Sequence, residues 1–183
     1  MYIPNSYDFF WNTSAENFRN KMWSYYQSFW TDNRKKKAAD QGLSSKEVII
    51  LAAIVQKETQ KVDERHRVAG VYLNRLKREM KLQADPTVIY AMKLKFHNFD
   101  TIIKRVLHKD LKIKSVYNTY KHWGLPPGPI TRPIKSFLIS KDCLIKCGPT
   151  EQYTFGISSF LSFRILTKLE IIFLNNPLFL QQP

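Results

Sequence analysis

The chain has 183 residues, of which 44% are hydrophobic, and a formal net charge of +14. This length allows one domain with a substantial core and is too short for two large domains. The charge suits an anionic partner such as nucleic acid, a phospholipid surface or an acidic cell-wall polymer. The basic residues are scattered, and neither a zinc-finger spacing nor a glycine-rich RNA-binding motif occurs, so we expect no nucleic-acid partner.

Targeting and metal-binding signals are weak. The opening MYIPNSYDFF has no basic region followed by a long apolar core, so we expect no signal peptide. Residues 155–180 come nearest to a membrane span, but charged residues and a proline interrupt them. Cys143 and Cys147 form a single C-x3-C pair without a histidine cluster. Zinc normally takes four such ligands, so we expect no metal site, while a disulfide stays open.

The first predicted helix begins after Thr13 or Ser14 and runs to about Trp30, with aromatic residues at helical spacing. We interpret that aromatic stripe as core packing. Residues 31–42, which include an Arg-Lys-Lys-Lys run, are predicted to form a polar connection with a solvated surface.

The second predicted helix, from about Ser45 to Gln60, begins with the capping-box spacing of Ser44 and Glu47. With residues about 100° apart around the axis, Glu58 falls within the apolar stripe. Gln56 falls on the side that should meet solvent or a neighbouring loop.

Burial and the negative end of the helix dipole both favour the neutral form of Glu58, so we expect its pKa to be raised. A carboxylic acid that is protonated near neutral pH can serve as a general acid, and glycoside cleavage commonly uses such a group. The alternative is a structural carboxylate that bonds Lys61 or a capping amide.

Further helices are predicted over residues 64–80, over a segment that begins at Asp85 and Pro86, and over residues 99–108. The 64–80 helix should pack on the Glu58 helix. Asp85 is interpreted either as the helix cap or as part of a functional site.

An irregular, rigid loop is predicted for residues 117–129, where a Tyr-Asn-Thr-Tyr cluster precedes a run rich in Gly and Pro. Its aromatic faces, amides and hydroxyls suit sugar binding. A structural turn with buried tyrosines is the alternative.

Four motifs stand in order along the chain: IVQKET, VAGVYLNRL, LQADPTVIYAM and VYNTYKHWGLPPGPI. Together they resemble the catalytic domain of the YceG-like endolytic murein transglycosylases (MltG), over roughly Ile3 to Pro133. The resemblance implies an α+β, predominantly helical, lysozyme-like domain that cleaves peptidoglycan strands between N-acetylmuramic acid and N-acetylglucosamine and leaves a 1,6-anhydro end.

The resemblance also implies the site. It places the catalytic glutamate at Glu58 and, where the family often has a second Glu, this chain has Gln56, a change that we expect to be tolerated. The substrate-binding residues carried over by motif are Gln83, Asp85, Tyr117, Asn118, Thr119 and Tyr120. Neither metal nor cofactor is expected. By resemblance, the partners are peptidoglycan strands and cell-wall synthesis proteins, and the location is the periplasmic face of the inner membrane.

The chain departs from the family pattern at both ends. Members normally carry a membrane helix and a LysM-like domain ahead of the catalytic part, so we expect a catalytic core alone over residues 1–133. Residues 134–183 match poorly and are interpreted as a divergent or degenerate C-terminal segment, whose loss of family features would put activity in doubt.

Two other functions compete with lytic cleavage. In a hydrolytic muramidase, Asp85 or Asp63 would activate water as the second carboxylate. In an inactive fragment, the cleft would bind glycan without turnover.

Overall fold

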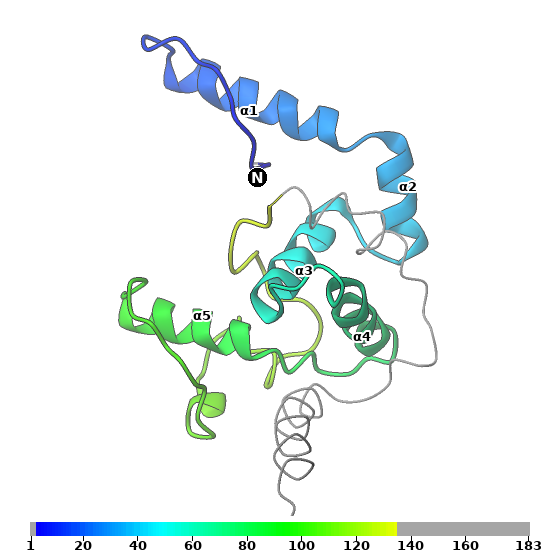
Figure 1. The fold of residues 1–183 in the computed structure, drawn as a ribbon, viewed down its shortest axis with the longest axis vertical. Coiled ribbons are helices and arrows are strands. Elements are labelled where there is room, and N and C mark those ends of the chain that lie inside the picture. Colours follow the sequence, from blue (N-terminus) through cyan, green and yellow to red (C-terminus); the bar gives the residue numbers. More distant parts are fainter. Residues whose placement is uncertain (1–2, 135–183) are drawn as a thin grey trace, which may run out of the picture. The chain divides into compact units, whose positions relative to one another are not determined.

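The computed structural model describes residues 3–134, which form five α-helices and one short 3₁₀-helix (Figure 1). The helices are α1 (Ala15–Phe29), α2 (Asp32–Asp40), α3 (Ser45–Glu58), α4 (Arg65–Lys77), α5 (Asp85–Phe96) and η1 (Asp110–Lys112). These bounds confirm the predicted helices at the positions of α1, α3, α4 and α5, although α3 and α4 each end earlier than predicted.

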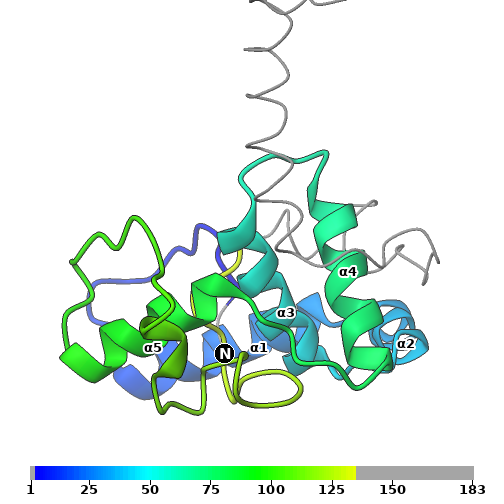
Figure 2. The ribbon, with the colours of Figure 1, turned by 90° about the horizontal axis from the view of Figure 1, so that it is seen from below.

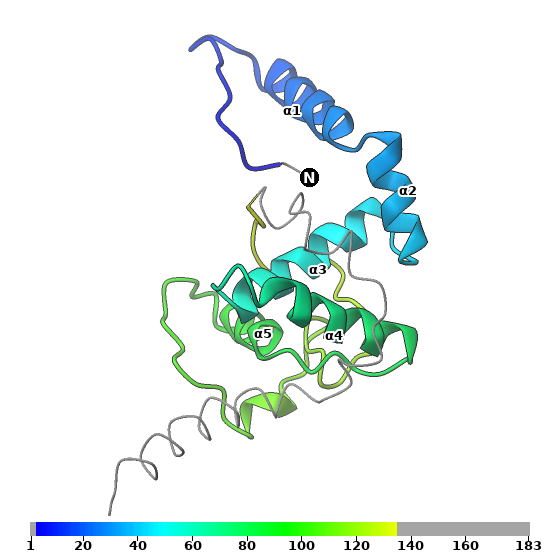
Figure 3. The same cartoon turned by 45° about the vertical axis from the view of Figure 1, so that its right-hand side comes forward.

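Helix α3 lies at the centre of this core and contacts α2, α4 and α5. Figures 2 and 3 show α4 beside it, and Figure 2 shows α5 on its other side. Its residues from Val48 to Val55 are all buried, with Leu51 to Val55 fully so. The expectation of a single apolar stripe was therefore too narrow. Because neighbours cover α3 on several sides, its middle turns are apolar all round.

The start of α3 confirms the predicted capping box. The Ser44 hydroxyl accepts a hydrogen bond from the Glu47 backbone N–H at 3.3 Å, and the Glu47 carboxylate accepts one from the Ser44 backbone N–H at 2.8 Å. The reciprocal pair satisfies two N–H groups that the helix itself leaves free. This local arrangement sets where the helix that carries Glu58 begins.

The polar connection predicted for residues 31–42 is wrong over most of its length, because α2 occupies Asp32–Asp40. The Thr31 side chain caps its N-terminus by accepting from the Arg34 N–H. Lys, Arg and Ala all favour helix, and a single buried contact, Ala38 at 2% exposure, anchors the segment. A charge run and a helix are therefore compatible here.

The predicted helix over residues 99–108 is also wrong, since this segment is irregular and only η1 follows it. Side chains satisfy its backbone instead. The Asn98 side chain accepts from the N–H groups of Asp100 and Thr101, both at 3.1 Å, and the Lys93 ammonium donates to the Phe99 carbonyl at 2.8 Å. Such local bonds compete with helix formation.

Residues 3–134 contain no strand, so the structure confirms the helical majority of the predicted α+β class but not its β part. The described residues end at Ile134, so they do not test the boundary expected after Pro133 or the divergent segment 134–183. Both cysteines lie outside them. No helix within residues 3–134 is long and apolar enough to cross a membrane.

Candidate functional site

Glu58 is the last residue of α3, and its carboxylate meets a phenol from the neighbouring helix. The Tyr72 hydroxyl, on α4, donates to Glu58 Oε2 at 3.2 Å. Tyr72 is completely buried and Glu58 is half-buried, so this hydrogen bond is partly shielded from water. The contact arises because α3 and α4 pack together along their apolar faces.

The pKa of Glu58 is raised above that of an ordinary Glu. Burial is the main cause, and the negative field of Asp85 acts in the same direction, while the Tyr72 hydrogen bond lowers the pKa. The carboxyl also stands in the last turn of α3, where the helix dipole opposes negative charge. The predicted direction of the shift is confirmed, and burial is its principal source.

If Glu58 were only a structural carboxylate, its expected partner was Lys61 or a capping amide. Lys61 instead pairs with Glu64 at 3.3 Å, and Glu64 also accepts from the Thr59 hydroxyl at 2.8 Å. These contacts tie the turn after α3 together independently of Glu58. The Glu58 carboxylate therefore bonds Tyr72 and not the turn after α3.

A second carboxylate and a second phenol lie close by. The Tyr120 hydroxyl donates to Asp85 Oδ1 at 2.5 Å, and both residues interact electrostatically with Glu58. The pKa of Tyr120 is raised by burial first and then by the Asp85 carboxylate, so the phenol stays protonated and donates. Asp85 makes no side-chain cap on α5, because its carboxylate turns to Tyr120. The cap interpretation of Asp85 is therefore wrong.

Asn118 and Thr119 are buried residues of the same loop that carries Tyr120. Asn118 is fully buried, and its amide donates to the carbonyls of Leu111 and Ile113 at 2.9 and 2.8 Å while its oxygen accepts from the Tyr120 N–H at 3.0 Å. Thr119 is 2% exposed. In this structure both residues shape the loop from within, and substrate contact by either stays a prediction.

Thr119 joins the loop to the start of α5. Its hydroxyl accepts from the Ala84 N–H at 3.0 Å and lies 2.8 Å from the Thr87 hydroxyl, while its carbonyl accepts from the Gln83 N–H at 3.2 Å. These bonds place Asp85 opposite Tyr120, because they lock residues 83–87 against residues 118–120. A site assembled from two distant segments is thereby held in register.

Gln83 and Tyr117 frame this arrangement. The exposed Gln83 has a left-handed backbone, with φ of 52°, and its side-chain oxygen accepts from Arg75 at 3.1 Å. The Tyr117 ring packs against Tyr90, with the ring centroids 4.8 Å apart. The Tyr117 hydroxyl lies 3.1 Å from where a Cβ at Gly128 would stand, so a side chain there would crowd it.

Gln56 meets a neighbouring loop, as the helical wheel allowed. Its side-chain oxygen accepts from the Ile134 N–H at 2.8 Å, and its amide donates to the Arg132 carbonyl at 3.5 Å. A Glu here would keep the first bond but turn a carboxylate oxygen toward a carbonyl. The contact gives Gln56 a structural role that the sequence did not reveal.

Tyr72 and Arg75 also belong to the site, although neither was predicted as a site residue from the sequence. The available signal for Tyr72 was that a phenol on the buried face of the helix predicted over residues 64–80 needs a hydrogen-bond partner. Arg75 donates to the carbonyls of Lys81 and Leu82, each at 2.9 Å. Among the described residues, no group of three His, Cys, Asp or Glu side chains could hold a metal ion.

Tyr72→Phe should raise the pKa of Glu58 further, because it removes the hydrogen bond that favours the carboxylate. The titration of the Glu58 side chain, followed by NMR in the folded protein, measures the change. Tyr90→Phe is the matched control, since the Tyr90 ring faces Phe99 and Tyr117. An unchanged or lowered Glu58 pKa in Tyr72→Phe would contradict the geometry described above.

Known proteins are similar to this chain in sequence. The sequence profile of the YceG-like family matches residues 1–139. Endolytic murein transglycosylases from Bacillus subtilis (strain 168) and Streptococcus pneumoniae (strain D39) are 42% identical over 107 residues and 37% identical over 91 residues. The matches cover 58% and 50% of this chain, but only 26% and 16% of the relatives' own lengths.

A solved structure agrees with these matches. The crystal structure of a YceG-like protein from Listeria monocytogenes is similar with a TM-score of 0.64 and 31% identity, covering 83% of this chain and 46% of that one. The similarity thus extends from the motifs to the fold.

Proposed function

This chain belongs to the YceG-like family, and we propose that it cleaves peptidoglycan strands as an endolytic lytic transglycosylase, with Glu58 as its general acid and base. One observation carries the proposal: a half-buried Glu58, with a raised pKa, receives a phenol hydrogen bond beside the Asp85–Tyr120 pair. The names of the Bacillus and Streptococcus relatives support the same substrate.

In the proposed reaction, protonated Glu58 gives its proton to the glycosidic oxygen between N-acetylmuramic acid and N-acetylglucosamine. The C–O bond breaks, the N-acetylglucosamine leaves as an alcohol, and the muramyl ring passes through an oxocarbenium-like state. The Glu58 carboxylate then takes the proton of the muramyl C6 hydroxyl, whose oxygen closes onto C1. The product is a 1,6-anhydro end, and Glu58 is protonated again.

The surroundings of Glu58 suit it to act first as the general acid and then as the general base. Burial favours the protonated carboxyl before cleavage, and the Tyr72 hydroxyl stabilises the carboxylate that cleavage leaves. The C6 hydroxyl belongs to the same sugar ring, so its attack gains from proximity and needs no second base. The raised pKa of Tyr120 keeps a hydrogen-bond donor at the Asp85 side of the site.

Hydrolysis by a muramidase is the second candidate, because Asp85 is close enough to act on Glu58 electrostatically. Two carboxylates are what ordinary glycosidases use. Against this role, the Tyr120 hydroxyl already occupies Asp85 Oδ1, which leaves less of that carboxylate free to activate water. Asp63 is exposed at the turn after α3 and is less suited still.

Product analysis separates these functions. Uncross-linked peptidoglycan strands treated with the protein should yield 1,6-anhydro ends and no new reducing ends, which mass spectrometry distinguishes by the mass of one water. New reducing ends would assign a muramidase. Strand binding without any cleavage would indicate a glycan-binding fragment that has lost turnover.

The domain bounds, the location and the partners are proposed from the resemblance to the family. Residues 1–133 are proposed to be the catalytic core, and residues 134–183 a divergent C-terminal segment. The envelope is the proposed location, at the periplasmic face of the inner membrane, with cell-wall synthesis proteins as partners. The net charge of +14 would favour contact with glycan strands whose stem peptides carry carboxylates.

A further inference from the structure

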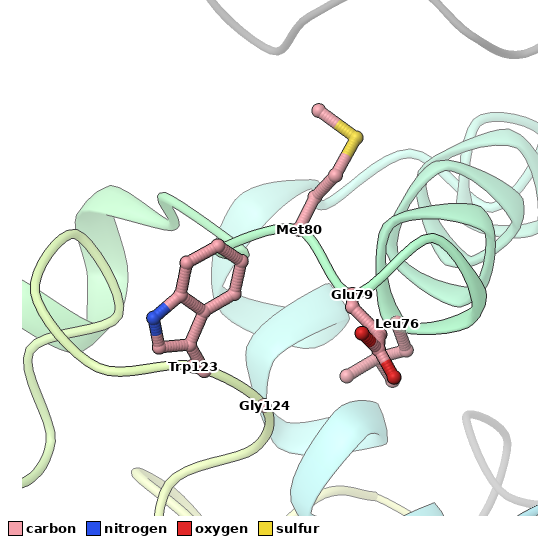
Figure 4. A pocket seen from close by; sticks show the side chains of 5 residues that line it. All are labelled: Leu76, Glu79, Met80, Trp123 and Gly124. Carbon is pink, nitrogen blue, oxygen red and sulfur yellow. The ribbon is translucent and has the colours of Figure 1, made fainter.

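A pocket of about 410 Å³ opens at the C-terminal end of α4, and the reaction proposed above makes no use of it. Leu76, Glu79, Met80, Trp123 and Gly124 line it, and Figure 4 shows the Trp123 ring across from Glu79 and Leu76. Trp123 is 65% exposed and Met80 46% exposed. Both side chains are therefore accessible to a ligand at the pocket wall.

Two turns with left-handed residues hold the pocket walls. Glu79 has φ of 53° although it is not a glycine, and Gly124 has φ of 73° directly after Trp123. The Arg75 guanidinium braces the first turn by donating to the carbonyls of Lys81 and Leu82, and the Met80 N–H donates to the Arg75 carbonyl at 2.8 Å. The Glu79 N–H also donates to the Leu76 carbonyl at 3.1 Å, so Glu79 is the left-handed residue that ends α4. The wall is therefore built before any ligand arrives.

The chemistry of the lining suits a sugar ring. The indole of Trp123 offers a flat apolar face to the C–H groups of a pyranose. The Glu79 carboxylate can accept from hydroxyl or amide groups. The Lys81 ammonium lies over one face of the Trp123 ring, 5.4 Å from its centre, which leaves the other face for a sugar, and it can donate to oxygens. Leu76 and Met80 add an apolar wall for an acetamido methyl group. An aromatic face with polar groups at its rim matches an N-acetylated sugar.

The pocket adjoins the site around Glu58 through two elements. Leu76 follows Tyr72 by one turn of α4, a rise of about 6 Å along the helix. Trp123 follows Tyr120 by three residues in the same loop. Both walls thus continue from residues that contact Glu58 or Asp85.

We propose that this pocket is a distal subsite that binds an N-acetylated sugar of the strand outside the cleaved disaccharide. The inference rests on the proposed function, because it takes a glycan strand as the ligand. Contact with a sugar away from the cleavage point would favour long strands over short fragments and would position the enzyme within a strand.

Binding to fluorescently labelled, uncross-linked glycan strands tests the proposal. Measured by anisotropy in the Glu58→Gln background, where nothing is cut, Trp123→Ala should weaken strand binding about tenfold, ~1.4 kcal/mol. Binding of a labelled disaccharide should change little. Trp123→Phe should restore most of the strand affinity, because it keeps a flat ring. The matched control is Trp11→Ala, which removes a 97% exposed tryptophan elsewhere and should not change strand affinity.

The outcomes separate this proposal from the catalytic one. Equal strand affinity in the Trp123→Ala and Trp11→Ala variants, or no strand binding by the Glu58→Gln chain, would overturn the subsite. Weakened strand binding in Trp123→Ala, with no anhydro product from the unmodified chain, would support the subsite and count against the lytic reaction.

Discussion

Glu58→Gln is expected to abolish anhydro-product formation from uncross-linked peptidoglycan, with a loss of roughly 10²–10⁴-fold or more in rate, because it removes the proton that general acid catalysis requires. The amide keeps the size of the side chain, and its oxygen can still accept from the Tyr72 hydroxyl. Glycan binding and the fold should therefore persist. The measurement is the initial rate of anhydro-end release at saturating substrate.

Glu64→Gln is the matched control, because it makes the same chemical change at the turn directly after α3. The Glu64 side chain contacts Thr59 and Lys61 and takes no part in the proposed reaction, so its variant should keep near-normal activity. Retained activity in Glu58→Gln would assign the acid elsewhere, with Asp85 the next candidate. If the unmodified chain is inactive, the comparison is made after a family-like C-terminal segment is joined beyond Pro133.

Stability gives an independent check on Glu58→Gln. The folded-state pKa of Glu58 is raised, so the wild-type protein should lose stability as pH rises from about 4.5, the ordinary Glu value, through the raised pKa. Gln carries no charge at any pH. The variant should therefore be more stable than the wild type at neutral pH, and the difference should disappear below the ordinary Glu pKa. Chemical denaturation at several pH values measures this.

Asn118→Asp should destabilise the protein by about 3 kcal/mol or more at neutral pH, because a buried donor pair is replaced by a carboxylate. The Asn118 amide donates to the carbonyls of Leu111 and Ile113, and an Asp oxygen there would face both without a proton. Catalysis should fall as well, since the same side chain holds the Tyr120 backbone. Urea unfolding and anhydro-product rates are the two measurements.

Asn98→Asp is its control, because Asn98 acts only as an acceptor in the bonds it makes to the N–H groups of Asp100 and Thr101. A carboxylate accepts from both equally well, and the site is exposed, so the change should stay within about 0.5 kcal/mol. Lowering the pH should restore part of the stability of Asn118→Asp, because a protonated Asp can donate one hydrogen bond. Equal effects of the two substitutions would contradict the role given to the Asn118 amide.

Local features of this protein could be predicted from sequence. The start of α3 depends on Ser44 and Glu47, three residues apart, and the structure confirms their reciprocal bonds. The direction of the Glu58 pKa shift also followed from its place in an apolar helix near a C-terminus. The helix predicted over residues 99–108 was wrong, because nearby side chains compete for its backbone hydrogen bonds. The side chains of Asn98 and Lys93 bond the backbone of residues 99–101, and a helix does not form there.

The partners of each site residue were decided by tertiary structure. Tyr72 meets Glu58 because two helices pack at a particular angle and register, and no spacing along the chain encodes that contact. Asp85 meets Tyr120, thirty-five residues later, because Thr119 locks their segments together. The sequence by itself determined which side chains can do acid chemistry and where their helices begin. Only packing decided which of them meet, since hydrogen bonds between distant segments depend on positions that the whole core sets.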